Sequence, residues 1–209
     1  MGSLELAGSP VERIAVDVLV VPLFEAETPL RGAAGRVDWR LCGRLSRLAA
    51  AGGMPCAVGG ALLTPGGGGV RAPRILGLGL GRRAELGAER WEAWLADALE
   101  RARLLRADSL ALALPACGDQ IAERLAQLAA AAASGLAPER VLVAPDPGEE
   151  SAAGQWFRRA SRRGQAGDLQ VMAPPDSRGP RGANPAAGRA DAPAQPARSS
   201  HAPTGRFTR

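Results

Sequence analysis

Two arginines flank a run of small residues at positions 31–36, with the sequence RGAAGR, just before a segment of helical periodicity that opens at Asp38. The first turn of a helix carries backbone N–H groups without partners, and these attract anions. Guanidinium groups add positive charge and paired donors. An alternative is that both arginines are solvated loop residues. The pattern makes this stretch the main small-ligand candidate of the sequence, as an anion-binding loop formed by Arg31, Gly32, Gly35 and Arg36.

Two other glycine-rich segments could hold a phosphate, but each also has a structural interpretation. The segment GLGRRA at 79–84 fits the pattern G-x-G-x-x-A, which binds a pyrophosphate where it joins a first strand directly to a helix. Here it follows a later strand, and the next helix starts near Ala88, which favours a tight turn. Four glycines at 66–69 could wrap a phosphate, yet their place between two short strands favours a hairpin connection. We expect no cofactor.

The remaining reactive side chains do not assemble a catalytic or metal-binding pattern. Cys42, Cys56 and Cys117 are widely spaced, which predicts buried free thiols. The single histidine, His201, lies near the end of the chain, and there is no lysine. We therefore predict no catalytic and no metal-ligating residue, because a nucleophile, a base and an orienting group cannot be assembled without them.

Charge and composition restrict the partners. All 26 basic residues are arginine, and the formal net charge is +5. Arginine outnumbers acidic residues only from residue 158 onward, so the pI near 10.6 says little about the rest of the chain. The cluster RRASRR at 158–163 suits a final helical turn. Nucleic-acid binding is not favoured, because Phe207 is the only aromatic residue of the tail.

The chain length of 209 residues indicates one domain, and neither a secretory signal nor an apolar run of membrane-spanning length is present. We expect a cytoplasmic protein with no membrane contact. From about residue 174 the sequence is dominated by Ala, Pro, Arg and Gly, which predicts disorder.

Short apolar runs alternate with segments of helical period, which predicts a three-layer α/β domain with a mixed, mostly parallel sheet flanked by helices. Asp38 and Asp119 stand where helix N-caps are expected. The predicted strands are 13–21, 59–64, 74–80, 109–114, 140–144 and 169–173, and the predicted helices are 38–51, 88–106, 119–134 and 149–163.

The strand, glycine loop and helix at residues 17–48, together with RILGLGLG at 74–81, resemble the N-terminal, macro-like domain of the leucyl aminopeptidase (cytosol aminopeptidase) family. The resemblance covers about residues 13–173. It implies an N-terminal extension at 1–12, a macro-like domain at 13–173 and a disordered tail at 174–209.

The resemblance also implies what the chain does. In the family, two metal ions held by a lysine and several carboxylates perform the hydrolysis in a C-terminal domain, and the N-terminal domain helps to assemble the oligomer. The motif Asn-Thr-Asp-Ala-Glu-Gly-Arg of that domain is missing here. We therefore expect a non-catalytic binding, assembly or regulatory module, not an enzyme by itself, whose partners would be further copies of itself or a separate aminopeptidase catalytic chain.

Two alternatives stay open. The chain could be a truncated, frameshifted or split piece of a metal-dependent leucyl aminopeptidase. It could instead bind ADP-ribose, another nucleotide or nucleic acid. Macro domains proper bind ADP-ribose with a glycine-rich loop at a comparable place, but they use an Asn-Ala-Ala-like strand end, where this chain has Val21-Pro22-Leu23.

Overall fold

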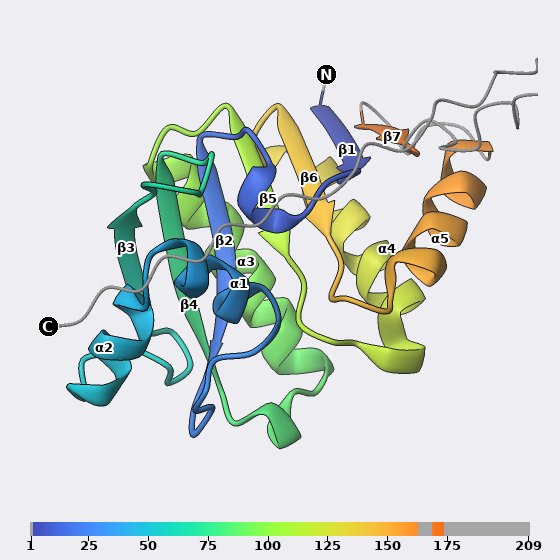
Figure 1. The fold of residues 1–209 in the computed structure, drawn as a ribbon. Coiled ribbons are helices and arrows are strands. Elements are labelled where there is room, and N and C mark those ends of the chain that lie inside the picture. The colour runs from blue at the N-terminus through green and yellow to red at the C-terminus, as the bar shows by residue number, and fades with distance from the viewer. Residues whose placement is uncertain (1, 163–168, 174–209) are drawn as a thin grey trace, which may run out of the picture. The chain divides into compact units, whose positions relative to one another are not determined.

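The computed structural model describes residues 2–162 and 169–173, which form an α/β domain on a seven-stranded sheet (Figure 1). The strand order is β3-β4-β2-β5-β6-β1-β7. Every neighbouring pair is parallel except β3 and β4, which are antiparallel. The prediction of a mixed, mostly parallel sheet is confirmed. The strands are β1 (Gly2–Leu6), β2 (Val18–Phe24), β3 (Ala61–Pro65), β4 (Arg74–Gly81), β5 (Ser109–Ala113), β6 (Arg140–Ala144) and β7 (Leu169–Met172).

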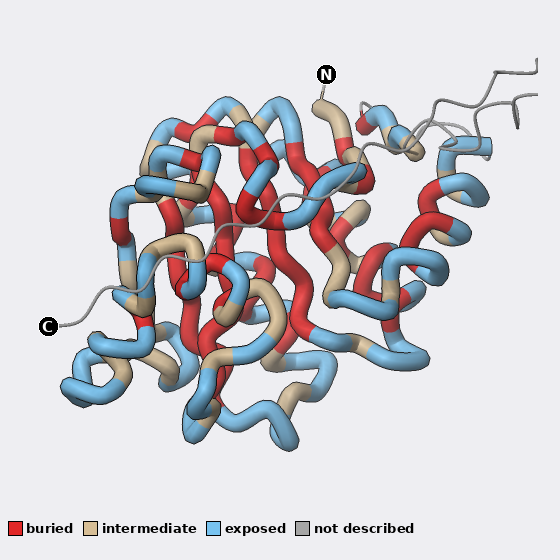
Figure 2. Tube along the Cα trace, in the orientation of Figure 1, coloured by how far each residue is buried: buried red, intermediate tan, exposed pale blue. Residues whose placement is uncertain are grey.

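Helices cover both faces of the sheet, as a three-layer domain requires (Figure 2). On β2, Val18 and Val20 pack in the core under α3, α4 and α5, whereas Leu19 and Val21 pack in the core under α1 and the 3₁₀ helix η1 (Val11–Arg13). Burial of both faces explains why the strands are apolar at consecutive positions. The helices are α1 (Gly32–Arg40), α2 (Arg44–Ala50), α3 (Ala88–Leu104), α4 (Ile121–Ala131) and α5 (Glu150–Arg162).

The first strand was not predicted from the sequence, because residues 1–12 were expected to form an extension. Residues 2–6 form β1, which lies between β6 and β7 inside the sheet. Leu4 and Leu6 are buried, while Glu5 reaches Arg140 of the neighbouring strand at 2.8 Å. Five residues with one charged member give too short an alternation to stand out in a sequence. The domain therefore begins before residue 13, and the predicted tail at 174–209 lies outside the described residues.

The helix predicted at 38–51 is two helices, and the first starts six residues earlier. Gly43 separates α1 from α2 with a φ of 75°, a left-handed conformation that glycine adopts without strain. Asp38 lies inside α1 and is buried, so it is not the N-cap of its own helix. Its carboxylate accepts hydrogen bonds from the backbone N–H groups of Leu45 at 2.7 Å and Ser46 at 3.2 Å. Asp38 thus caps α2.

The two other glycine-rich segments have the structural roles that the sequence favoured. The four glycines at 66–69 connect the antiparallel strands β3 and β4. Gly81 ends β4 with a φ of 69°, and a short 3₁₀ turn precedes α3. A side chain at Gly79 would collide with the backbone carbonyl of Ala57. The glycines of this motif let a neighbouring loop pack directly on the strand.

Candidate functional site

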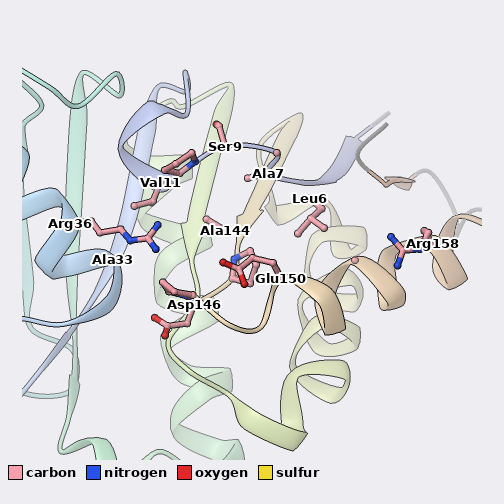
Figure 3. A pocket seen from close by; sticks show the side chains of 15 residues that line it. Leu6, Ala7, Ser9, Val11, Ala33, Arg36, Ala144, Asp146, Glu150 and Arg158 are labelled. Atoms are coloured by element: carbon pink, nitrogen blue, oxygen red, sulfur yellow. The ribbon is translucent and has the colours of Figure 1, made fainter. Parts of the chain in front are cut away.

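A cavity lies at the carboxyl ends of β1 and β6, between α1 and α5, with a volume of about 380 Å³ (Figure 3). Parallel strands bring their carboxyl ends to the same edge of the sheet, where ligand sites of open α/β domains commonly form. Most of the lining is apolar or small. It includes Leu6, Ala7, Pro10, Val11, Ala33, Ala144, Pro145 and Pro147.

Four charged residues also line this cavity. Arg36 projects toward it from α1, and Glu150 faces it from the start of α5, while Arg158 lies further along α5 (Figure 3). Asp146 belongs to the loop that joins β6 to α5. The cavity lining therefore combines an apolar surface with two positive and two negative side chains.

Asp146 stands at the start of α1. A Cβ atom added to Gly32, the first residue of that helix, would lie only 2.6 Å from the Oδ1 atom of Asp146. Gly32 also has a φ of 53°, so both the space and the backbone require glycine. Burial raises the pKa of Asp146, and the nearby charge of Glu149 raises it further, although Arg83 and Arg36 act in the opposite direction. The Asp146 carboxylate therefore lies directly beside the first residue of α1.

The neighbouring acid Glu149 contacts the segment that leads into α4. Its Oε1 atom accepts hydrogen bonds from the backbone N–H groups of Cys117 at 2.7 Å and Gly118 at 2.5 Å. These two residues follow β5 and lead into α4. The other oxygen of Glu149 is buried and has no hydrogen-bond partner within the described part of the chain. A loop that follows β6 thus places carboxylates at the beginnings of two different helices.

The predicted anion-binding residues are only partly brought together. Arg36 lines the cavity, but Arg31 is the N-cap residue of α1, is exposed and is not part of the cavity lining. Gly32 faces Asp146, and Gly35 is required because a Cβ there would lie 2.5 Å from the carbonyl oxygen of Leu30. The segment is the first turn of α1 and not a loop. Anion binding by these four residues stays a prediction.

The cysteines are free, as predicted, but they are not all buried. Cys42 is exposed, with Cys56 and Cys117 half-buried. Burial raises the pKa of the Cys117 thiol to about 12, with a further contribution from Glu149. Within residues 2–162 and 169–173, no cluster of three or more His, Cys, Asp or Glu side chains could hold a metal ion. No helix in those ranges has the length and apolar character to cross a membrane.

Known structures place this fold in the macrodomain class. The macrodomain of Mycobacterium tuberculosis DarG superposes with a TM-score of 0.56 at 15% identity, over 69% of this chain and 99% of that one. The Oceanobacillus iheyensis macrodomain with ADP gives a TM-score of 0.56 at 14% identity, over 74% of this chain and 90% of that one. At such identities the likeness concerns the fold alone.

The sequence itself defines the family. The model of the cytosol aminopeptidase family, N-terminal domain, matches residues 20–138, and the chain therefore belongs to this family through that domain. A leucine aminopeptidase mutant from tomato has a TM-score of 0.53 at 16% identity, over 68% of this chain but only 32% of the enzyme. No curated protein matches the chain in sequence. The resemblance inferred from residues 17–48 and 74–81 is confirmed, and the match concerns the N-terminal domain of the family, not its catalytic domain.

The positions of Asp146 and Glu149 were not predicted from the sequence. The only local signal is the loop PDPGEE at 145–150, which follows a predicted strand and carries three acidic residues. Their roles depend on β6 lying beside β5 and opposite α1, an arrangement that no local pattern specifies.

Proposed function

We propose that this chain is a non-catalytic binding module of the cytosol aminopeptidase N-terminal type, and that its cavity at the ends of β1 and β6 takes a small ligand. The observation that carries the proposal is the cavity itself, with its apolar lining and its few charged side chains. Ligand sites usually combine these two features, and a volume of about 380 Å³ falls in their common range.

An uncharged molecule of nucleoside size suits the site best. The apolar lining can enclose a flat ring, and the carboxylates of Asp146 and Glu150 can accept hydrogen bonds from amino or hydroxyl groups. The likeness to a macrodomain with bound ADP supports this class of ligand, because that ligand contains an adenosine group. Adenosine is therefore the probe of choice.

Isothermal titration calorimetry with adenosine tests the proposal. We expect saturable one-to-one binding by the wild-type protein. Ala33→Leu, which fills the cavity from the first turn of α1, should weaken binding about tenfold or more. Ala130→Leu adds the same side chain at an exposed position of α4 and should leave binding unchanged. Failure of wild-type protein to bind adenosine would overturn this choice of ligand.

A second function is the assembly of an aminopeptidase, either as a homo-oligomer or with a separate catalytic chain. Family membership favours it, and so does Trp39 on α1, which is 73% exposed. Tryptophan is enriched at protein interfaces. If the chain assembles through this residue, Trp39→Ala should lower the mass found by light scattering. A gene for the metal-binding domain directly downstream, in any reading frame, would favour the split or truncated alternative.

A further inference from the structure

A pair of backbone N–H donors at the carboxyl edge of the sheet is already occupied by one of the protein's own carboxylates, and a second carboxylate of the same loop lines the cavity. The occupied donors are the N–H groups of Cys117 and Gly118, from which Glu149 accepts at 2.7 and 2.5 Å. The second carboxylate is Asp146, which lines the cavity beside Gly32, the first residue of α1. Both acids come from residues 145–150, which we call the acidic loop.

An anionic ligand would have to compete with these carboxylates. Like charges at short range repel, and they do so more strongly near a protein surface than in bulk water. A pyrophosphate at the edge of the sheet would meet Asp146 in the cavity wall, with Glu149 next to it. The donors that usually attract phosphate at helix starts are also already used, at least at Cys117 and Gly118.

Positive charge also lies near Asp146, and part of it is paired with other acids. Arg83 lies close enough to Asp146 to act on its pKa, but its guanidinium is engaged by Glu27 at 2.8 Å. Arg36 and Arg158 line the cavity together with Asp146 and Glu150, so its lining carries two positive and two negative side chains. Burial raises the pKa of Asp146 and the charge of Glu149 raises it further, and the two arginines only partly offset this.

We propose that the acidic loop is a built-in substitute for a bound anion, through which Asp146 and Glu149 make the cavity select uncharged ligands and reject diphosphates. This specificity rests on the proposed function of the cavity. It makes adenosine the better ligand of the wild-type protein and ADP-ribose the poorer one. Asp146 and Glu149 therefore act as specificity-determining residues.

Pyrophosphate is the probe that separates this inference from the proposed function, because it contains the charged group alone. The double variant Asp146→Ala, Glu149→Ala removes both carboxylates and frees the N–H donors. We expect it to bind pyrophosphate at least tenfold more tightly than the wild-type protein does, measured by calorimetry. Glu149→Gln serves as the matched control, because its amide oxygen still accepts from Cys117 and Gly118. It should gain much less than Glu149→Ala.

Each outcome decides one of the two proposals. Pyrophosphate binding by the double variant, and not by the wild-type protein, supports the role of the acidic loop. Equal binding by both, or by neither, overturns it, whatever adenosine does. Adenosine binding decides the function of the cavity separately. If the double variant does not fold, Glu149→Ala alone is titrated with pyrophosphate, and unmoved amide resonances of Cys117 and Gly118 then overturn the inference.

Discussion

Asp17 and Asp146 are the same residue type at opposite ends of the sheet, and their environments are opposite. Asp17 precedes β2 and accepts hydrogen bonds from the backbone N–H of Asp108 at 3.0 Å and from both the N–H and the hydroxyl of Ser109 at 2.9 Å. These bonds from Ser109 lower the pKa of Asp17. Asp146 follows β6, and burial raises its pKa. The charge of Asp17 therefore stabilises the folded state. The charge of Asp146 is unfavourable in the folded state and lies at the cavity.

The difference shows where the domain places its least favourable charges. At the amino end of the strands, a carboxylate ties β2 to the turn before β5. At the carboxyl end, carboxylates are brought next to a cavity and next to each other. Strain or unfavourable charge concentrated near a site is typical of function, which agrees with the specificity proposed for the acidic loop.

The largest effect is expected from removing the favourable carboxylate. Asp17→Ala deletes an acceptor with three donors, and bonds to a charged group contribute about 1.5 to 3 kcal/mol. We expect the free energy of unfolding, measured with urea, to fall by about 2 kcal/mol. Asp108→Ala, an exposed neighbour that keeps its backbone N–H, should change it by less than about 0.5 kcal/mol. Equal losses for the two variants would contradict the role given to Asp17.

A smaller effect of opposite sign is expected from Asp146→Asn. Because the folded pKa of Asp146 is raised, its contribution to stability is most favourable below its unfolded value near 3.8 and is lost as the pH rises through the folded value. The variant should therefore melt about 1 to 3 °C higher than the wild-type protein at pH 7. The gain should vanish below pH 3.8, where the aspartic acid is neutral in both states.

The same pH scan sharpens the comparison with Asp17. Its folded pKa is lowered, so its stabilisation is present above the unfolded value and is lost as the pH falls through the folded one. Asp17→Asn should thus be destabilised near neutral pH and approach the wild-type protein in acid. Glu150→Gln is the control for the acidic loop, and its melting temperature should move little. If Asp146→Asn melts lower than the wild-type protein at pH 7, the charge of Asp146 is favourable and the comparison fails.

The layers of the domain could be predicted because their signals are local. Trp91, Trp94 and Leu95 repeat with the helical period and are buried in α3. Apolar runs covered on both faces marked β4, β5 and β6. The start of α1 could not be predicted in this way, since Gly32 and Gly35 are typical of loops. Both glycines are needed there because Asp146 and the carbonyl of Leu30 come too close for a side chain.

The candidate site was harder to predict because its contacts join distant parts of the chain. Glu149 reaches Cys117 across 32 positions, and Asp17 reaches Ser109 across 92. Neither pair has a fixed spacing that a sequence motif could record. Arg36 was predicted from the sequence as part of a loop leading into a helix at Asp38, whereas the structure places it inside α1. The positions of Asp146 and Glu149 near this helix depend on the strand order, which only the structure provides.

The smallest effect concerns the thiol that lies next to Glu149. Burial is the main reason why the pKa of Cys117 is raised to about 12, and the charge of Glu149 is the second. Glu149→Gln removes the charge while keeping the shape and the acceptor, so alkylation of Cys117 by iodoacetamide at pH 8.5 should accelerate by about two- to fivefold. Exposed Cys42 provides the internal reference, and its rate should not change. Peptide mapping by mass spectrometry gives both rates. An unchanged ratio of the two rates would mean that the charge of Glu149 does not act on the Cys117 thiol. One of the two charges on which the specificity of the acidic loop depends would then be lost.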